Sequence, residues 1–366
     1  MSVYDELIGQ AHIVQILQAA VTAASSGEES QEMTHAWIFT GPPGSGRSSA
    51  AIAFAQALVC KKQGCNECND CTTAKSGSHP DIEILRSEGL SIKIDEIREL
   101  LTRTSWAPAM GSWRVVVMED ADRLTESAAN ALLKAIEEPG LRTVWLLCAP
   151  TLHDILPTIR SRCRHIQLHT PGNSEVAKFL IDRHQIAPKM ADFAARVSQG
   201  HIGRARHLAT NEEVRNRRNA ILAIPSQLTS IANAYKQAQK LVDLANAESA
   251  AITESLDEKE YEELSTALGK GSGKALKELE KEQKSRATRI TRDTLDGALL
   301  DLATYYRDIL LVQSGHNDSL INAELSDQIN RFATESKPQN ILAKMDAIMS
   351  ARENLQRNGA PLLIME

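Results

Sequence analysis

Aromatic residues are scarce in this chain and make up only 4% of its 366 residues. Positive charge is not in excess either, since the formal net charge at pH 7 is -6. A protein that grips nucleic acid over its whole surface needs basic side chains, and one that binds single strands also needs aromatic side chains for base stacking. The composition therefore argues against a stand-alone nucleic-acid-binding protein, although it leaves room for a local basic patch.

Long apolar segments are missing as well. The longest apolar runs fall far short of the roughly 18 residues that a membrane-spanning helix needs. The opening residues MSVYDELIGQAHIV contain neither the basic stretch nor the apolar stretch of a secretory signal peptide. We therefore expect a cytoplasmic protein without membrane contact, and the length predicts two or three domains.

The six cysteines are unevenly distributed along the chain. Four of them fall within one stretch of twelve residues, at Cys60, Cys65, Cys68 and Cys71. Cytosolic thiols stay reduced, and the spacing C-x4-C-x2-C-x2-C suffices for a tetrahedral zinc site with four thiolate ligands. Such a shell is closed, so the zinc would be structural; an iron–sulfur cluster and redox thiols are the alternatives. Cys148 and Cys163 lie elsewhere and are expected to be plain structural thiols.

Strand and helix patterns alternate from about residue 35 to residue 170. Strands are predicted at residues 36–40, 81–85, 114–118, 143–149 and 164–168. Helices are predicted at residues 48–59, in IDEIRELLTR and in TESAANALLKAIEEP, where Thr125 can cap the helix and Pro139 can close it. This alternation predicts an α/β fold, a parallel sheet with helices on both faces.

The strand pattern disappears after Pro171. Residues 174–209 read as a small helical unit, and the remainder of the chain is helical to Glu366. One apolar stripe recurs at helical spacing, through Leu295, Leu299, Leu302, Tyr306, Ile309 and Leu310. The charge-rich piece 254–293 is predicted to form a long, solvated helical hairpin with the glycine-rich GKGSGK at its turn.

The segment TGPPGSGRSSAA follows the first predicted strand and matches the phosphate-binding pattern G-x-x-x-x-G-K-[ST] except at one position. Gly41, Gly44 and Gly46 let the backbone turn its N–H groups inward, and the next helix points its positive dipole at the same place. Arg47 stands where lysine is usual; it keeps the charge, but it is longer, planar and forked. Ser48 remains available as a hydroxyl ligand of Mg²⁺. The alternative is a glycine turn that binds no ligand.

A nucleotide site needs a second half, an apolar strand that ends in Asp-Glu. Here VVVMEDAD gives Glu119 and Asp120 in the reverse order, so the metal-ligand position is one methylene too long and the water-activating position one too short. In-line attack on a γ-phosphate depends on close positioning of the reacting groups. Arg47 and this reversal are two independent departures from the pattern, and together they predict that hydrolysis is lost.

The segments MEDADRLTESAANALLKAIEEP and LPTIRSRCRHIQL, together with DELIGQAHIVQIL near the start, resemble the clamp-loader branch of the AAA+ ATPases. The resemblance covers residues 5–210 and is much weaker over the helical C-terminal part. It implies an AAA+ core at residues 1–170 with a zinc module inserted at 60–71, a small helical lid at 171–212 and an all-helical collar domain at 213–366. It also implies a hetero-oligomeric ring of clamp-loader subunits, which opens a sliding clamp and places it on primer–template DNA.

The same resemblance implies roles for three further residues. Arg162, in the triplet Ser-Arg-Cys, matches the arginine finger that reaches a γ-phosphate bound by the next subunit and stabilises transition-state charge. Thr151 matches the polar residue that senses the γ-phosphate, and Arg204 matches the lid arginine that reports the nucleotide state. The alternatives are a surface arginine paired with an acid for Arg162 and a helix-surface arginine for Arg204.

Three functions compete at this point. The favoured one is a non-motor subunit of the ring, with negligible ATPase of its own, a structural zinc ion and a doubtful ATP–Mg²⁺ site. The second is a motor subunit that hydrolyses ATP itself, and the third is a free-standing zinc protein that binds nucleic acid. The intact lysine and Asp-Glu pair that the second needs are absent, and the composition disfavours the third.

Overall fold

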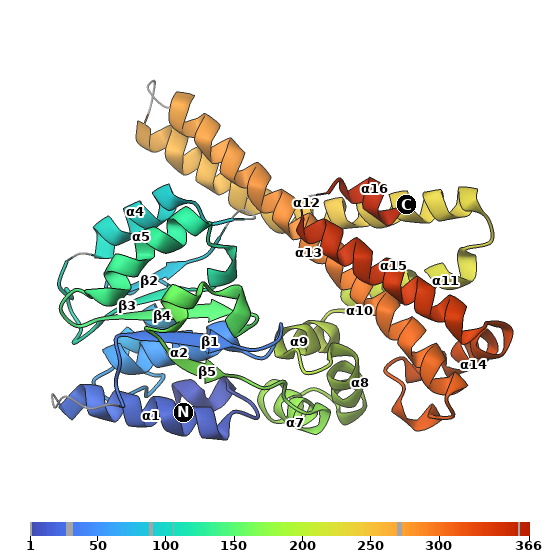
Figure 1. Ribbon diagram of the computed structural model, residues 1–366, viewed down its shortest axis with the longest axis horizontal. Helices are drawn as coiled ribbons and strands as arrows, with labels where there is room; N and C mark the ends of the chain where they lie inside the picture. Colours follow the sequence, from blue (N-terminus) through green and yellow to red (C-terminus); the bar gives the residue numbers. More distant parts are fainter. Residues whose placement is uncertain (1, 27–31, 88–90, 105, 269–272, 358) are drawn as a thin grey trace. The chain divides into compact units, whose positions relative to one another are not determined.

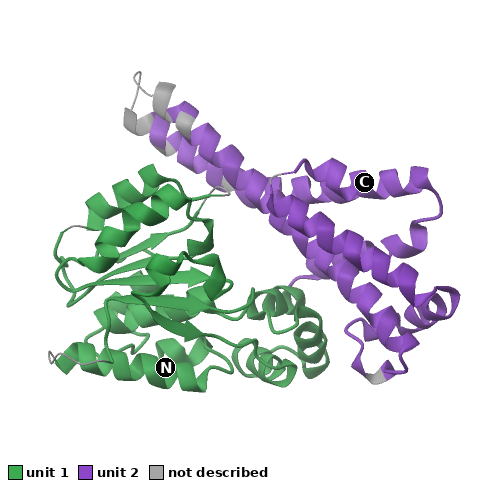
Figure 2. Cartoon of the chain, viewed as in Figure 1, with its two compact units in different colours: residues 1–210 green, residues 211–366 purple. Residues whose placement is uncertain are grey.

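The computed structural model describes residues 2–26, 32–87, 91–104, 106–268, 273–357 and 359–366 (Figure 1). The chain divides into two compact units, residues 1–210 and residues 211–366 (Figure 2). In the described parts, unit 1 contains a parallel sheet with flanking helices and unit 2 is helical. The fold class predicted from the sequence is thereby confirmed, while the finer boundaries near residues 170 and 212 stay predictions.

Over the described residues, unit 1 forms a sheet of five parallel strands in the order β2-β3-β4-β1-β5. The strands are β1 (Ala36–Thr40), β2 (Ile82–Leu85), β3 (Arg114–Met118), β4 (Thr143–Ala149) and β5 (Arg164–Gln167). All of them point the same way, so their carboxyl ends share one edge of the sheet. Because β1 lies between β4 and β5, the segment that follows it is at the interior of that edge.

Helices cover both faces of this sheet. They are α1 (Ala11–Ser26), α2 (Arg47–Val59), α3 (Asn69–Ser76), α4 (Ile94–Thr104), α5 (Glu126–Glu137) and α6 (Pro157–Arg160), with the short 3-10 turns η1 (Val3–Glu6), η2 (Ala121–Arg123) and η3 (Leu152–Asp154). One core includes Trp37 and Phe39 of β1 with Phe54 of α2, and the other includes Ile38 of β1 with Leu132 of α5. Successive residues of β1 thus bury opposite faces, which explains why the strands read as continuous apolar runs.

The limits of α5 follow from its local sequence. The Thr125 hydroxyl accepts a hydrogen bond from the Ala128 N–H at 3.3 Å, which satisfies one of the free amides of the first turn. Of the apolar side chains expected to share one face, Ala128, Leu132 and Ile136 are buried and Leu133 is half-buried, and the helix ends before Pro139. The predicted cap and end of this helix are confirmed.

Asp81 precedes β2 and is fully buried. Its carboxylate accepts hydrogen bonds from three backbone N–H groups, those of Ala109 at 2.5 Å, Met110 at 2.8 Å and Gly111 at 2.5 Å. Burial alone would raise the pKa of Asp81, but these donors, helped by His79, bring it below its ordinary value. The carboxylate therefore holds part of the segment between α4 and β3 in one conformation.

We expect Asp81→Asn to lower the free energy of unfolding by about 2 to 3 kcal/mol at pH 7, because a charged acceptor for three buried donors is lost. Folding lowers the pKa of Asp81, so its stabilisation is present above the ordinary carboxyl pKa and is lost as the pH falls below about 4. Urea unfolding of both proteins at several pH values measures the two effects. Asp95→Asn on α4 is the control, since this side chain is 86% exposed. Equal stability of the Asp81 variant and the wild type at pH 7 would contradict this role.

Three helices follow the sheet within unit 1: α7 (Asn173–His184), α8 (Pro188–Ser198) and α9 (Ile202–Thr210). Helix α8 packs against both α7 and α9. Small and apolar side chains make up most of their buried residues, such as Val176 and Leu180 of α7 and Ala191 and Ala194 of α8. The small helical unit predicted after Pro171 is therefore present.

Unit 2 is built from α10 (Glu212–Leu222), α11 (Ile224–Gln227), α12 (Ile231–Leu268), α13 (Gly273–Gln313), α14 (Ser326–Glu335), α15 (Pro338–Gln356) and α16 (Pro361–Met365), with the 3-10 turns η5 (Asn317–Ser319) and η6 (Ala323–Leu325). Helices α12 and α13 pack side by side, and Arg286 of α13 pairs with Asp257 at 3.0 Å and Glu260 at 2.5 Å on α12. The predicted hairpin is confirmed over these helices, whereas its predicted turn, GKGSGK, falls mostly on residues 269–272, outside the described residues. The predicted stripe is buried at Leu295, Leu299, Leu302, Tyr306 and Ile309. Among the described residues, no helix combines the length and the apolar character that crossing a membrane requires.

Candidate functional site

The glycine loop joins β1 to α2 at the carboxyl edge of the sheet. Gly41 opens the loop, and its N–H donates to the Pro150 carbonyl oxygen at 3.1 Å. Gly44 and Gly46 have φ angles of +84° and +89°, in the left-handed region that glycine enters without strain. Helix α2 begins at Arg47, one residue earlier than predicted, with Gly46 as its N-cap. The free N–H groups and the positive dipole end of α2 therefore lie at the loop, an arrangement suited to an anion.

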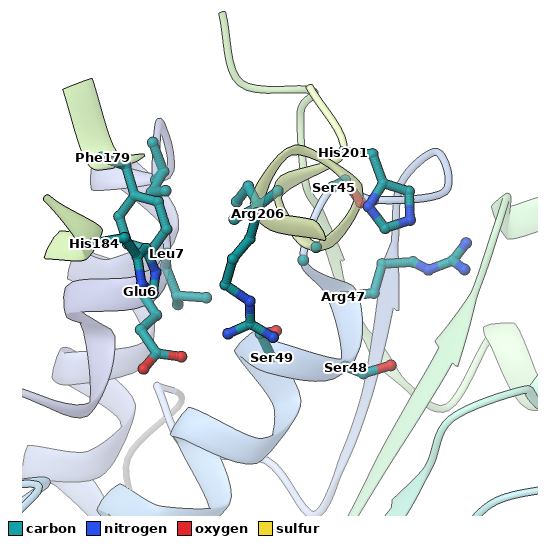
Figure 3. Close-up of a pocket in the computed structure, with 15 residues that line it drawn as sticks. Glu6, Leu7, Ser45, Arg47, Ser48, Ser49, Phe179, His184, His201 and Arg206 are labelled. Carbon is teal, nitrogen blue, oxygen red and sulfur yellow. The ribbon is translucent and has the colours of Figure 1, made fainter. Parts of the chain in front are cut away.

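A pocket of about 370 Å³ lies beside this loop within unit 1 (Figure 3). Its walls come from the N-terminal segment, from the glycine loop with the start of α2, and from the helical region after the sheet. They are formed by Glu6, Leu7, Ile8, Gly44, Ser45, Gly46, Arg47, Ser48, Ser49, Phe179, His184, His201, Ile202, Gly203 and Arg206. Most of these residues are polar or glycine, and Leu7, Ile8, Phe179 and Ile202 are the apolar members.

Arg206 of α9 faces this pocket. Figure 3 shows its side chain extending from α9 into the pocket toward Ser49. Arg204, the lid arginine predicted from the sequence, is not among the described residues that line the pocket. Residues two apart on a helix lie about 200° apart around its axis, so the two side chains leave the helix on different faces. The role of Arg204 stays a prediction, and Arg206 is an additional candidate that the sequence alone did not single out.

Arg47 borders the pocket, but its guanidinium is engaged with the loop itself. The Arg47 Nη1 donates to the Gly41 carbonyl oxygen at 2.7 Å, and Figure 3 shows the side chain directed away from Arg206. A lysine at this position would extend toward bound phosphates, whereas the longer, forked side chain bonds the backbone of its own loop. Burial raises the pKa of Asp122, and the positive charge of Arg47 is among the influences that oppose this rise.

His201, which immediately precedes α9, packs against the glycine loop. A Cβ atom at Gly44 would lie only 2.3 Å from His201 Cγ, so only glycine fits there. The His201 Nδ1 accepts the Arg204 N–H at 3.2 Å. Burial lowers the pKa of His201, and the charges of Arg204 and Arg47 lower it further, so the ring is neutral at physiological pH.

Two acidic residues follow β3 at the same edge of the sheet. The Glu119 Oε1 pairs with the Arg86 Nε at 3.2 Å. Asp120 occupies the N-cap position of η2, immediately before that turn. The carboxylate predicted as a metal ligand, that of Glu119, is therefore already paired with a cation of the same chain.

Thr151 and Ser48 complete the predicted set. Thr151 follows β4 and donates its backbone N–H to Asp154 Oδ2 at 2.8 Å. Ser48 lines the pocket, and its hydroxyl interacts with the buried Cys148 thiol, whose pKa is raised chiefly by burial. The sheet thus brings the loop, the acidic pair and Thr151 to one edge, but of these predicted residues only Gly44, Gly46, Arg47 and Ser48 line the pocket.

Arg162 follows α6, and its side chain is 41% exposed. Its Nη2 pairs with Glu137 Oε1 of α5 at 2.6 Å. Its Nη1 donates to the Thr158 carbonyl oxygen at 2.9 Å and to Ser161 Oγ at 3.1 Å. These bonds hold a partly exposed guanidinium in a defined place on unit 1, while the finger role concerns a neighbouring subunit and stays a prediction.

The four clustered cysteines converge in space. The Sγ atoms of Cys60, Cys65, Cys68 and Cys71 all lie within 4.8 Å of one another. The Cys60 Sγ is 3.7 Å from the Cys65 Sγ and 3.6 Å from the Cys68 Sγ. Tetrahedral thiolates at about 2.3 Å from a zinc ion would be about 3.8 Å apart, so these separations fit a metal ion.

Backbone donors and burial act in opposite directions on the thiols of this cluster. The Cys71 N–H donates to Cys68 Sγ at 3.4 Å. The backbone N–H groups of Glu67 and Cys68 lower the pKa of Cys65 to about 6, whereas burial raises the pKa of Cys68 and of Cys71. The thiolate is the form that binds metals, so the four cysteines could hold a metal ion.

Comparisons with known proteins identify the family. The sequence family described as "DNA polymerase III, delta subunit" matches residues 14–172, and the one described as "DNA polymerase III, delta subunit, C terminal" matches residues 258–362. The chain is 26% identical to the DNA polymerase III subunit delta' of Bacillus subtilis (strain 168), over 90% of its own length and 88% of that protein. It is 35% identical to the delta' subunit of Pseudomonas aeruginosa, over 40% of its own length and 46% of that protein.

Two further proteins are similar over most of the chain. The DNA polymerase III subunit tau of Bacillus subtilis is 26% identical over 99% of this chain and 60% of its own length. A solved structure of a DNA polymerase III gamma subunit-related protein from Thermotoga maritima covers 93% of this chain and 99% of that chain, with 17% identity and a TM-score of 0.42.

The parallel sheet, the glycine loop after an interior strand and the helical C-terminal unit define an α/β protein of the phosphate-binding-loop class. Both halves of the chain match DNA polymerase III sequences, and the relatives named above include delta' subunits from two bacteria. The chain belongs to the DNA polymerase III delta' family of clamp-loader subunits.

Proposed function

We propose that the chain is a non-motor subunit of the DNA polymerase III clamp loader. In this role it joins other subunits in a hetero-oligomeric ring that places a sliding clamp on primer–template DNA during replication. It contributes Arg162 to the ATP site of a neighbouring subunit and has negligible ATPase of its own. The helical unit 2 would serve its assembly with the other subunits.

The engagement of Arg47 and Glu119 carries this proposal. Phosphoryl transfer depends on a cation at the β- and γ-phosphates and on a carboxylate that holds Mg²⁺. Here the Arg47 Nη1 is bonded to the Gly41 carbonyl oxygen at 2.7 Å, and Glu119 is paired with Arg86 at 3.2 Å. Both groups would have to leave their partners before the site could align an in-line attack, so we expect no turnover by the chain alone.

The environment of Arg162 supports a role in trans. Both side chains of its ion pair with Glu137 are nearly half exposed, Arg162 at 41% and Glu137 at 46%. An ion pair this exposed contributes about 1 kcal/mol or less, so exchanging the Glu137 carboxylate for a phosphate costs little. The phosphate carries more negative charge and can accept both N–H groups of the planar fork.

A structural zinc ion is the second part of the proposal. Four sulfur donors at near-tetrahedral separations suit zinc and leave no open coordination position for catalysis. A zinc ion, when bound, would tie the end of α2 to the start of α3. An iron–sulfur cluster uses the same ligand type, so metal analysis decides between the two.

The test of this function compares the purified chain with the reconstituted assembly. We expect no measurable ATP turnover by the chain alone, whereas the complete assembly should need it for DNA-stimulated ATPase and for clamp loading. Arg47→Lys alone should not create an active enzyme, because Glu119 and Asp120 remain in the reverse order. Steady-state ATPase of the pure chain that is abolished by Ser48→Ala would instead establish a motor subunit.

A further inference from the structure

The first residues of the chain connect the cysteine cluster to helix α7. Residues 2–10 form a strap that contains η1 and ends where α1 begins. The cysteine module is residues 60–76, which comprise the loop after α2 and helix α3 and carry the four clustered cysteines. The strap, the module and α7 all belong to unit 1, so the contacts among them lie within one compact unit.

The strap is anchored on the cysteine module by a backbone hydrogen bond and by apolar packing. The Val3 N–H donates to the Gly64 carbonyl oxygen at 3.0 Å. A Cβ atom at Gly64 would lie 2.6 Å from Val3 Cγ2, so the two residues are in close contact. Val3 and Tyr4 are buried in the same core as Cys60 and Cys71. A shift of the module therefore moves the strap, because close-packed groups transmit displacement.

The strap also contacts α7 and the segment that leads to it. The Asp5 Oδ2 pairs with the Arg183 Nη2, in the last turn of α7, at 2.9 Å. The buried Gln10 donates its side-chain N–H to the His169 carbonyl oxygen at 2.6 Å and accepts the His169 N–H at 3.4 Å. The last turn of α7 and the segment before α7 are therefore both bonded to the strap.

Helix α9 is held in a different way. His201, immediately before α9, packs directly on the glycine loop, where a Cβ atom at Gly44 would lie 2.3 Å from His201 Cγ. This contact does not involve the strap. A displacement of the strap should therefore affect α7 more than α9, which makes α9 an internal control.

We infer that the strap makes the position of α7 on unit 1 depend on metal loading of the cysteine module. With the four thiolates on one ion, the loop around Gly64 is fixed, and the strap holds the last turn of α7 through Asp5. Without the ion, that loop loosens and the last turn of α7 opens more often. The inference rests on the proposed function only in placing a metal ion on the cysteines, and it is independent of Arg162.

The position of α7 matters for the pocket. Glu6 and Leu7 of the strap line it, and so do Phe179 and His184 of α7. Figure 3 shows these four side chains on the same side of the pocket. Metal loading of the module would thereby set the position of one wall of the pocket from outside it.

Hydrogen exchange of the full chain, with and without the metal, tests the inference. Cys68→Ser supplies the metal-free form, and Cys163→Ser, outside the cluster, is the matched control. Release of a partly exposed ion pair changes a local opening equilibrium by about fivefold at most, so exchange in the last turn of α7 should be about two- to fivefold faster without the metal. Exchange in α9 should change by less than about twofold. Unchanged exchange in α7 after metal loss would overturn the inference.

Two glycine variants test the strap without removing a ligand. Gly64 and Gly77, the C-cap of α3, both have left-handed backbone, with φ angles of +100° and +75°, so alanine strains both turns. Gly64→Ala also pushes a Cβ atom against Val3, whereas at Gly77 the nearest atom outside the turn, Ile84 Cδ1, is 3.8 Å away. Gly64→Ala should therefore accelerate exchange in the last turn of α7 about as much as metal loss does, and Gly77→Ala should not. Equal exchange in α7 of the two variants would rule out the strap as the connection.

Arg183→Gln removes the contact at the far end of the strap. On its own it should accelerate exchange in the last turn of α7, and adding Gly64→Ala should then have little further effect, because both act through one connection. Additive effects would contradict a shared connection. Elemental analysis of every sample identifies a failure of the proposed structural metal, whereas equal α7 exchange in samples that differ in metal content identifies a failure of the strap.

Discussion

Truncating Arg162 to alanine should leave the chain folded and able to assemble, while DNA-stimulated ATP hydrolysis at the site it faces falls on the order of 10³-fold. The reason is that a guanidinium in trans stabilises charge on the transferred phosphoryl group in the transition state, and alanine leaves that charge uncompensated. Clamp loading by the whole assembly should fall with it. The measurements are the steady-state ATPase and the rate of clamp loading of a reconstituted assembly that contains the variant chain.

Two further variants distinguish a role of Arg162 as an arginine finger from a purely structural role in its ion pair with Glu137. Arg162→Lys should be nearly as damaging, because a point charge cannot reproduce the planar fork. Glu137→Gln removes the same ion pair, which is 2.6 Å long in the isolated chain, but keeps the guanidinium. If the ion pair with Glu137 were the function of Arg162, both partners' variants would behave alike; a finger predicts that only the arginine variants lose activity.

The relative effects of Arg162 and Arg47 decide the assignment of roles. Arg47→Ala should slow the assembly much less than Arg162→Ala, since the loop of this chain turns over no ATP of its own. An assembly stalled by the Arg47 variant but normal with the Arg162 variant would make the chain a nucleotide sensor and would reverse the roles.

Much of unit 1 could be predicted because its signals are local. The apolar run of β3 and the periodic face of α5 each depend on residues within one element, and the cap at Thr125 depends on a neighbour three residues away. The cysteine cluster could also be predicted, because its four ligands lie within one short stretch and their spacing already implies a common centre. The strand β2 begins at Ile82 rather than at Asp81, since Asp81 turns its carboxylate toward the N–H groups of a segment well beyond β2.

The pocket could not be predicted in the same way, because its walls come from distant parts of the chain. Leu7 and Ile8 lie far before the glycine loop, and Phe179 and His201 far after it. A sequence pattern identifies the loop but contains no signal for which side chains fold over it. For the same reason, a helix bearing two arginines in close succession does not reveal which one faces the pocket, and it is Arg206 that does.

The side-chain directions of Arg47 and Arg162 could not be predicted from the sequence either. The pattern shows that Arg47 replaces a lysine, but its bond to the Gly41 carbonyl oxygen depends on the curvature of the loop. The pairing of Arg162 with Glu137 joins α5 to the segment after α6 through packing of two helices. In both cases the sequence identified the residue, and the tertiary structure supplied its partner.

The cysteine cluster is physically connected to the wall of the pocket. The Val3 N–H donates to the Gly64 carbonyl oxygen at 3.0 Å, and a Cβ at Gly64 would lie 2.6 Å from Val3 Cγ2. Lys75 of α3 pairs with Glu6 at 2.8 Å, and Glu6 lines the pocket. The segment from Val3 to Glu6 is therefore bonded both to the loop between α2 and α3 and to α3 itself, which carry the four cysteines.

Loss of the metal should accordingly have both a local and a more distant effect. We expect the purified chain to contain about one zinc ion, and Cys68→Ser to lose it, since three thiolates bind zinc more weakly than four. Cys163→Ser, outside the cluster, should keep the zinc and is the matched control. Metal content by elemental analysis measures this step, and iron in place of zinc would contradict the identity of the metal but not the site.

The consequence for stability follows from where the ligands lie. Cys60 ends α2 and Cys68 caps α3, so removing the metal should lower the midpoint of thermal unfolding of the chain by about 5 °C or more, equivalent to about 2 kcal/mol in a unit of this size. Hydrogen exchange should accelerate in the peptide from Val3 to Glu6, whereas β3 and β4 should stay protected, because their core packs against α5 as well as α2. Acidification should release the metal by protonating the thiolates. A metal-free preparation with four titratable thiols, unchanged exchange at Val3–Glu6 and full thermal stability would refute a structural metal at this cluster.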